Sequence, residues 1–300
     1  MREIHQPGSY SYVFSPYREA VAHVAPGETV VVFTKDAFED RITKADDVPS
    51  EILGSYLNPQ TGPIYVDGAE PGDTLAVHIV DIEATRDWAV SVLVPFFGGL
   101  TSTKFTKTLQ SPLPERVWLY QIADGWLDHN ARLRFPWRPF LGTIGTAPEM
   151  EALSALTPFD HGGNMDVPDV RPGNTIYLPV RVPGALFYTG DCHAGQGQGE
   201  LCGVALEISA KVTLRFEVIK GKSIEWPRIE SPDEYMVVGS ARPMEDAARI
   251  AYAGLIDWMV ELGWDRIEAY QALTQIGDCY VGNMVDTLYS MVAKIRKEYV

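Results

Sequence analysis

One short pattern recurs three times in this chain of 300 residues and constrains its fold more than any other feature. Pro-Gly pairs begin at Pro26, Pro71 and Pro172, and each is followed by an alternating run that contains β-branched residues. Proline and glycine fit the two central positions of a type II turn, and such alternating runs are typical of strands. A single pair would carry little weight, since Pro-Gly turns precede strands in many proteins. Three of them predict a mainly β body, of the β-sandwich or jelly-roll type, with an internal duplication.

The chain changes character near residue 235. Residues 243–262 have helical spacing, with proline at the start, acidic residues in the first turn and Gly263 after the end. Asp265 can cap a shorter helix, a strand is expected around Cys279, and the basic C-terminal tail predicts a last helix. We therefore expect a β-rich body at residues 1–234 and a smaller C-terminal α/β element, residues 235–300, packed on that body.

Composition limits the classes of partner. The formal net charge is -15 and the sequence pI is about 4.8, so the surface repels phosphate groups. Nucleic acid and membranes are therefore poor candidates, whereas a neutral small molecule meets no electrostatic barrier. No apolar run approaches the roughly 20 residues of a membrane-spanning helix. The N-terminus lacks a secretion signal and there are only three cysteines, so we expect a cytoplasmic protein with free thiols.

The densest group of chemically active residues is a glycine-rich stretch at residues 188–200. If its first part is extended, Asp191 and His193 share one face and Cys192 points the other way. A carboxylate and an imidazole placed in this way can bind one metal ion or form a proton-transfer pair. Interleaved glycines could bring the remaining polar residues to the same side. These residues are Gln196, Gln198 and Glu200. The alternative is a solvated turn between two strands.

A second polar stretch, residues 160–166, contains His161, Asn164 and Asp166, and we expect it to form the other half of the same site. Asp36 closes the first predicted strand, where it could reach this site or equally cap the following turn. Residues 88–140 are rich in aromatic residues and proline, which predicts hairpins and loops. Their aromatic rings are expected in the core, with a few, such as Phe140, as alternative walls of an apolar pocket.

Several long motifs in one order show that the chain resembles the acetamidase/formamidase family over most of its length. They are Pro26-Gly-Glu-Thr with Asp36, residues 61–73, residues 139–148, His161-Gly-Gly-Asn-Met-Asp166 and residues 190–200. The resemblance implies a β-rich fold, self-assembly, hydrolysis of short amides to acid and ammonia, and a divalent metal. This chain has Gln198 where the family's central motif usually carries Asp, and an amide is a weaker, uncharged metal ligand.

The resulting hypothesis is metal-assisted hydrolysis of a short aliphatic amide, with zinc as the expected ion and calcium as the alternative. Asp191 and His193 would bind the metal, with Asp36 as a third ligand. Glu200 would act as general base and acid. The remaining residues of the predicted site would orient substrate, stabilise the oxyanion or support the site. They are His161, Gln196, Gln198 and Asp166.

Two other classes of protein remain open. A non-catalytic small-molecule binding protein could keep the pocket without the chemistry, and Gln198 favours that alternative. A metal-free hydrolase could use Cys192 as nucleophile, but no strong base signature accompanies it, so a structural thiol is favoured.

A β body with exposed sheet edges also predicts a homodimer or homotetramer.

Overall fold

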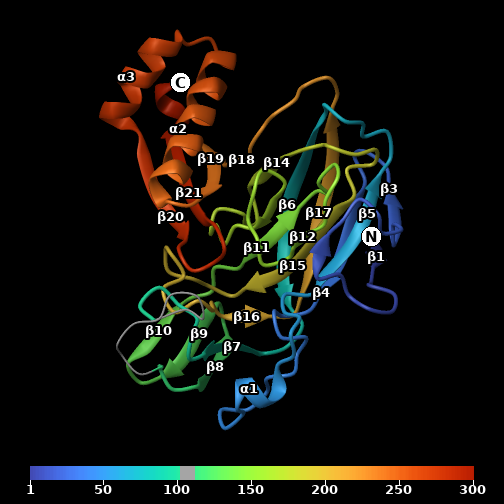
Figure 1. Ribbon diagram of the computed structural model, residues 1–300, viewed down its shortest axis with the longest axis vertical. Coiled ribbons are helices and arrows are strands. Elements are labelled where there is room, and N and C mark those ends of the chain that lie inside the picture. The colour runs from blue at the N-terminus through green and yellow to red at the C-terminus, as the bar shows by residue number, and fades with distance from the viewer. Residues whose placement is uncertain (102–111) are drawn as a thin grey trace.

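The computed structural model describes residues 1–101 and 112–300 of the chain (Figure 1). Within these ranges strands dominate, as predicted, and most of them belong to two large sheets. The first sheet is mixed. Strand β1 pairs with β4 in parallel, and every other pair of neighbouring strands in this sheet is antiparallel. In spatial order it contains β1 (Arg2–Ile4), β4 (Thr29–Thr34), β17 (Ala210–Ile219), β6 (Thr74–Ala84), β14 (Thr175–Pro179), β18 (Arg228–Glu230), β19 (Glu234–Ala241), β21 (Tyr289–Arg296) and β20 (Asp278–Asn283).

The second sheet carries the glycine-rich stretch on its strand β15. Its main path is β10 (Leu133–Pro136), β9 (Trp126–Asn130), β8 (Arg116–Ala123), β7 (Trp88–Leu93), β16 (Glu207–Ile208), β15 (Phe187–His193), β11 (Phe140–Gly145) and β13 (Gly162–Asn164). Off this path, β5 (Gln60–Val66) pairs with β15 and with β3 (Ala22–Val24). A small third sheet joins β12 (Leu153–Ser154) to β2 (Val13–Phe14).

The main hydrophobic core lies between the two large sheets. It is one cluster of buried side chains, with Val32, Leu75 and Leu214 from the first sheet and Ile144 and Phe187 from the second. The rings of Phe187 on β15 and Phe216 on β17 pack edge to face with centroids 5.0 Å apart. Side chains of two sheets that interdigitate in this way form a sandwich-like body, which confirms the predicted mainly β class.

The three Pro-Gly pairs precede β4, β6 and β14, and these strands all belong to the first sheet. Gly27, Gly72 and Gly173 have φ values of 85°, 92° and 90°. A type II turn requires positive φ at its second central residue, which glycine adopts without steric cost. The three Pro-Gly pairs therefore form turns of the same kind, and each turn leads into a strand of the first sheet.

The C-terminal part combines helices with the edge of the first sheet. Helix α2 (Met244–Glu261) and helix α3 (Arg266–Ile276) pack beside β19–β21 at one end of the molecule (Figure 1). Asp265 caps α3 by accepting hydrogen bonds from the backbone N–H groups of Ile267 and Glu268, as expected for a helix N-cap. The predicted α/β element is confirmed, and its strands continue the sheet of the body. The division of the chain at residues 234/235 remains a prediction.

One expected element is wrong. The basic tail forms strand β21, followed by the short 3₁₀ helix η1 (Lys297–Tyr299). Residues 289–295 mostly alternate between buried and half-buried, and β21 is hydrogen-bonded between β19 and β20. Pairing on both edges therefore outweighed the helical preference of Lys and Arg in this segment.

Strands β7 to β10 are successive antiparallel neighbours within residues 88–140, where hairpins are predicted. The short helix α1 (Pro49–Ile52) begins at Pro49. Residues 102–111 of that predicted hairpin region lie outside the described residues. Among the helices that the structure describes, none is long and apolar enough to span a membrane.

Candidate active site

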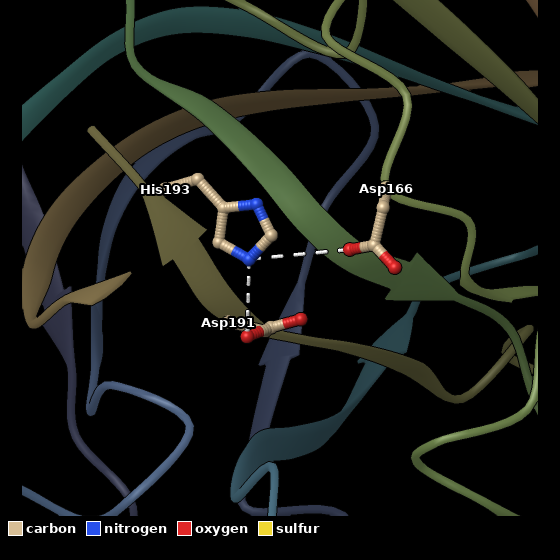
Figure 2. Close-up of side chains that lie close together, drawn as sticks. All are labelled: Asp166, Asp191 and His193. Carbon is tan, nitrogen blue, oxygen red and sulfur yellow. Dashed lines mark ion pairs between the residues drawn. The ribbon is translucent and has the colours of Figure 1, made fainter. Parts of the chain in front are cut away.

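The C-terminal end of strand β15 carries Asp191 and His193, the two residues that the alternating sequence pattern predicts on one face. Asp191 and His193 converge, with 3.3 Å between Asp191 Oδ1 and His193 Nε2, and Asp166 Oδ1 lies 3.9 Å from the same nitrogen (Figure 2). Cys192 faces the main core, where its Sγ is 3.3 Å from Thr34 Oγ1. Burial raises the pKa of this thiol to about 12, so the Cys192 thiolate is a poor candidate nucleophile.

The hydrogen bonds of Gln196 define the protonation of the His193 ring. Its amide nitrogen donates to the backbone carbonyls of Asp166 and Gly282, at 2.9 and 3.1 Å. The amide oxygen therefore faces His193 Nδ1, 3.0 Å away, and an oxygen can only accept. It follows that Nδ1 carries the proton and that Nε2 presents its lone pair to the surrounding carboxylates. This is how proteins orient a histidine that binds metal.

Two glutamates complete the group around His193. Glu207, on β16, places Oε1 3.3 Å from His193 Nε2. Glu200 follows the glycine-rich turn, and its carboxylate lies close enough to His193 and Glu207 for the three to bind one ion. Asp166, Asp191 and His193 form a second such group, so His193 is shared by both. Among the described residues, neither group contains Asp36.

The carboxylates of this site are strongly coupled. Burial, followed by repulsion from neighbouring carboxylates, raises the pKa of Asp166, Glu200 and Glu207 well above the ordinary range. Burial likewise raises the pKa of Asp286 to about 7. Asp191 is the exception: burial would raise its pKa, but the neighbouring His193 and several hydrogen bonds lower it. So much buried negative charge needs protons or a cation to compensate it.

The arrangement of polar atoms fits a bound cation. In the described part of the chain, Asp166 Oδ1, His193 Nε2 and Glu207 Oε2 are buried and have no hydrogen-bond partner. Buried polar atoms are almost always paired, and these three atoms belong to the two groups that could hold an ion. Imidazole nitrogen with carboxylate oxygens is a donor set used by zinc and other transition metals.

The backbone is strained where the site forms. Asp166, Asp191 and Glu200 all have positive φ, between 50° and 53°, which is uncommon for residues other than glycine. Gly142 on β11 has no side chain, which leaves space for the side chains of Asp166, Asp191 and His193. A Cβ there would lie 2.6 Å from Asp166 Oδ1 and 2.7 Å from His193 Cε1. Three acidic residues of one cluster thus share an uncommon backbone conformation.

Several residues that hold the carboxylates were missed by the sequence reasoning. Asn58 and Thr143 donate to Asp191 Oδ2 at 3.3 and 3.0 Å. Asn283 donates to Asp166 Oδ2 at 3.1 Å and to Asp286 Oδ2 at 2.8 Å. A signal for Asn283 exists in the sequence, because Gly-Asn-Met occurs twice, at residues 163–165 and 282–284. Both copies precede a site aspartate, Asp166 or Asp286.

Asp36 and His161 are placed differently from the central group. Asp36 Oδ2 accepts from Arg86 Nη2 at 2.6 Å, while its Oδ1 accepts from the backbone N–H groups of Phe38 and Asp40. The two backbone contacts of Oδ1 correspond to the second expectation for Asp36, a cap on the turn that follows β4. His161 is fully buried with its ring edge to face with Phe14, at 4.7 Å between centroids, and burial lowers its pKa to about 3. It is therefore a neutral imidazole.

A cavity of about 860 Å³ lies next to the buried group. Glu200 lines both the cavity and the cluster, and Gln196 lies on the same wall. Phe140, whose ring packs edge to face on His193 at 4.9 Å, also lines it. Gln198 is exposed and contributes to the cavity wall. A molecule in the cavity would thus reach the carboxylates through Glu200.

The fold and site together define a class: a sandwich-like β protein with a buried carboxylate–imidazole centre beneath a cavity. Residues 10–157 and 150–287 match the model of the Acetamidase/Formamidase family. The chain belongs to this family, which confirms the resemblance seen in its motifs.

Solved structures share the whole architecture. An acetamidase from Yersinia enterocolitica is 41% identical, with a TM-score of 0.96 over 99% of this chain and 92% of that one. An acetamidase from Bacillus halodurans is 32% identical, with a TM-score of 0.91 over 99% and 98% of the two chains. A formamidase from Methylophilus methylotrophus is 25% identical over 72% of this chain. The chain spans 62% to 68% of the length of the curated relatives that it matches.

Proposed function

We propose that this protein hydrolyses a short primary amide, of the acetamide or formamide type, to the carboxylic acid and ammonia with the help of a divalent cation. One observation carries the proposal: buried carboxylates surround the unpartnered Nε2 of His193 and open to a cavity through Glu200. The names of the relatives support the class of substrate. The negative surface does not repel a neutral amide.

Asp166, Asp191, His193 and Glu207 are the residues that would hold the cation. When bound there, it would polarise the amide carbonyl and lower the pKa of a water molecule. An imidazole ligand favours zinc over calcium, because calcium takes oxygen ligands. Gln198 is exposed, whereas the residues of both ligand groups are buried, so we propose that an amide at this position does not bind the ion directly.

Glu200 is the proposed proton carrier. Its carboxyl faces both the cavity and the cluster, and burial raises its pKa well above the usual value. A carboxyl group with a raised pKa can accept a proton from the attacking water and return it to the departing nitrogen near neutral pH. The amide C–N bond is then broken with the proton on ammonia and the hydroxyl oxygen on the acyl carbon.

The other predicted residues fall into distinct proposed roles. Gln196 uses its amide to orient His193, so we assign it a positioning role. Asp166 stands among the ligands, and Gln198 stays a candidate for contact with substrate at the cavity wall. The neutral ring of His161 and the Arg86-bound Asp36 would act from outside the ligand group, by supporting the loops from which they project.

The proton-carrier role is tested by Glu200→Gln. We expect turnover of acetamide or formamide to fall at least about 100-fold, the usual contribution of general acid–base catalysis, with bound metal retained. Glu245→Gln, on the exposed first turn of α2, is the matched control and should keep both. Near-normal ammonia release by Glu200→Gln would contradict the proton-carrier role.

Asp191→Ala tests the proposed metal ligand. The variant should bind less metal than the wild type, as measured by elemental analysis, and full metal occupancy would reject Asp191 as a ligand.

Assembly and location belong to the same proposal. Strands β1 and β20 are the edges of the first sheet in the described residues, and exposed edges often pair between subunits. We propose a homodimer or homotetramer, and a monomer in light scattering would contradict it. The three cysteines are free, which suits a cytoplasmic protein.

A further inference from the structure

The cavity beside Glu200 is large for the substrates that the relatives' names suggest. Its volume of about 860 Å³ lies in the range of pockets that enclose drug-sized ligands, roughly 300–1,000 Å³. Acetamide has only four non-hydrogen atoms. A substrate of that size would occupy the end of the cavity near Glu200 and leave most of its wall without contact.

The wall of the cavity has a defined chemistry. Much of its lining is aromatic and aliphatic, and these residues come from several separate segments. These are Tyr120, Leu133, Phe135, Phe140, Leu201 and Leu206. The rings of Tyr120 and Phe135 pack edge to face, with centroids 6.1 Å apart, which gives this wall a fixed shape. A wall of this kind gains free energy by covering apolar surface rather than by binding a charge.

The cavity lining also contains polar and charged groups. Gln196 and Glu200 belong to the part that joins the buried carboxylates. Asp169 and Tyr280, which are hydrogen-bonded to each other at 2.7 Å, and the cationic Arg138, Arg171 and Lys294 line it as well. An amide group beside Glu200 would leave its acyl chain to contact the apolar lining residues.

We propose that the cavity binds the acyl group of a larger primary amide, a medium-chain or arylalkyl carboxamide, whose amide group reaches Glu200. This inference rests on the proposed amide hydrolysis and extends its substrate class upward in size. The reaction is the same: water adds its hydroxyl to the acyl carbon, and the C–N bond breaks to release ammonia. The part of the substrate remote from the bond supplies binding free energy through the apolar wall.

The test is kcat/KM for a series of primary amides from acetamide to hexanamide, followed by phenylacetamide. Each buried methylene adds about 0.8 kcal/mol of binding, so kcat/KM should rise about fourfold per methylene. A value that is constant or falls beyond acetamide would overturn the inference while leaving amide hydrolysis in place.

Two variants test whether this wall is responsible. Phe135→Ala should reduce the rise along the series, whereas Phe33→Ala, on β4 and stacked on His5, should retain it. Gly197→Leu adds volume at the cavity wall, where a Cβ meets no atom within 4 Å, so it avoids disturbing the core. It should reduce kcat/KM for hexanamide more than for acetamide. Equal losses for both amides in both variants would overturn the inference.

Calorimetric binding separates the two proposals. Phenylacetamide should bind the intact protein more tightly than acetamide, and Phe135→Ala should weaken that preference. If no amide releases ammonia but this binding pattern is seen, hydrolysis fails and the cavity assignment stands. If phenylacetamide does not bind more tightly than acetamide, the cavity assignment fails whatever the protein hydrolyses.

Discussion

At the scale of single residues, the site depends on the orientation of one ring. His193 could present either nitrogen to the carboxylates, and Gln196 selects Nε2 because its own amide nitrogen is held by two backbone carbonyls. Asp191 and His193 share a face of β15, as the alternating pattern predicts. The structure adds the fixed tautomer, which depends on hydrogen bonds from segments distant in the sequence.

Gln196→Ala tests this positioning role. The substitution removes the acceptor from His193 Nδ1, so the ring can rotate or change tautomer. We expect metal affinity to fall about 10- to 100-fold, as is typical when an outer hydrogen-bond partner of a metal ligand is lost. Zinc titration with a competing chelator measures the change. Gln198→Ala, which alters the exposed glutamine of the same turn, is the control and should keep wild-type affinity. Equal affinity of Gln196→Ala and wild type would contradict the role.

At the scale of elements, the turn between β20 and β21 reaches from the C-terminal part into the site. Asn283, at the end of β20, donates to Asp166 and Asp286, and Asn164 Nδ2 donates to Asp286 at 2.7 Å. The C-terminal strands thus do more than extend the first sheet. Strand β20 carries Asn283, whose side-chain amide donates to two of the buried carboxylates.

Asn283→Ala tests the contribution of this turn. The change leaves Asp166 Oδ2 without a donor, whereas Asp286 Oδ2 keeps the hydrogen bond from Asn164, so we expect a cost of about 1–3 kcal/mol of unfolding free energy. We expect a lower Tm and a lower kcat/KM together, measured by thermal unfolding and by ammonia release. Asn130→Ala, at the exposed end of β9, is the matched control and should change neither. Wild-type Tm and activity for Asn283→Ala would show that the turn does not support the site.

Elements with local signals were predictable, whereas elements set by distant partners were not. The Pro-Gly turns and helices α2 and α3 carry their own start and stop residues, and the structure confirms them. The sequence predicts a helix where strand β21 lies, because only the pairing of β21 with β19 and β20 makes this segment a strand. Likewise, the contacts of Asn58 with Asp191 and of Asn283 with Asp166 join residues distant in the sequence, so no local pattern predicts them. Asp36 fits a ligand and a cap equally well in the sequence, because the fold alone brings Arg86, fifty residues away, to its Oδ2.

At the scale of the whole molecule, the buried acids couple stability to pH. Five of them, Asp36, Asp166, Glu200, Glu207 and Asp286, have raised pKa values in the folded protein, with Asp286 at about 7, against roughly 4 when unfolded. Between about pH 4 and pH 7 the folded metal-free protein keeps protons that the unfolded chain has released. Its unfolding free energy therefore falls as pH rises through this window. Asp191, whose pKa is lowered, has the opposite effect at more acidic pH, and the buried His161, whose pKa is lowered to about 3, opposes the fall up to about pH 6.5. The several acids with raised pKa values outweigh this single histidine.

We expect metal-free protein to have a lower Tm at pH 7 than at pH 5. The slope should be about 1.4 kcal/mol per pH unit for each proton retained. A bound divalent cation replaces those protons, so the metal-loaded protein should lose this slope. Asp286→Asn should show a smaller slope than the wild type in the metal-free form. Thermal unfolding at both pH values measures these differences, and a metal-free Tm that rises from pH 5 to pH 7 would contradict the coupling.

The central claim is that the carboxylates around His193 hold a cation used in amide hydrolysis. The most direct measurement is ammonia release from formamide, acetamide and hexanamide by protein stripped of metal and then refilled with zinc, calcium or manganese. Elemental analysis of each sample gives the bound metal. We predict no turnover in the stripped protein and turnover that returns with about one equivalent of zinc. Full activity in metal-free protein, or no ammonia with any of the three ions, would contradict the account.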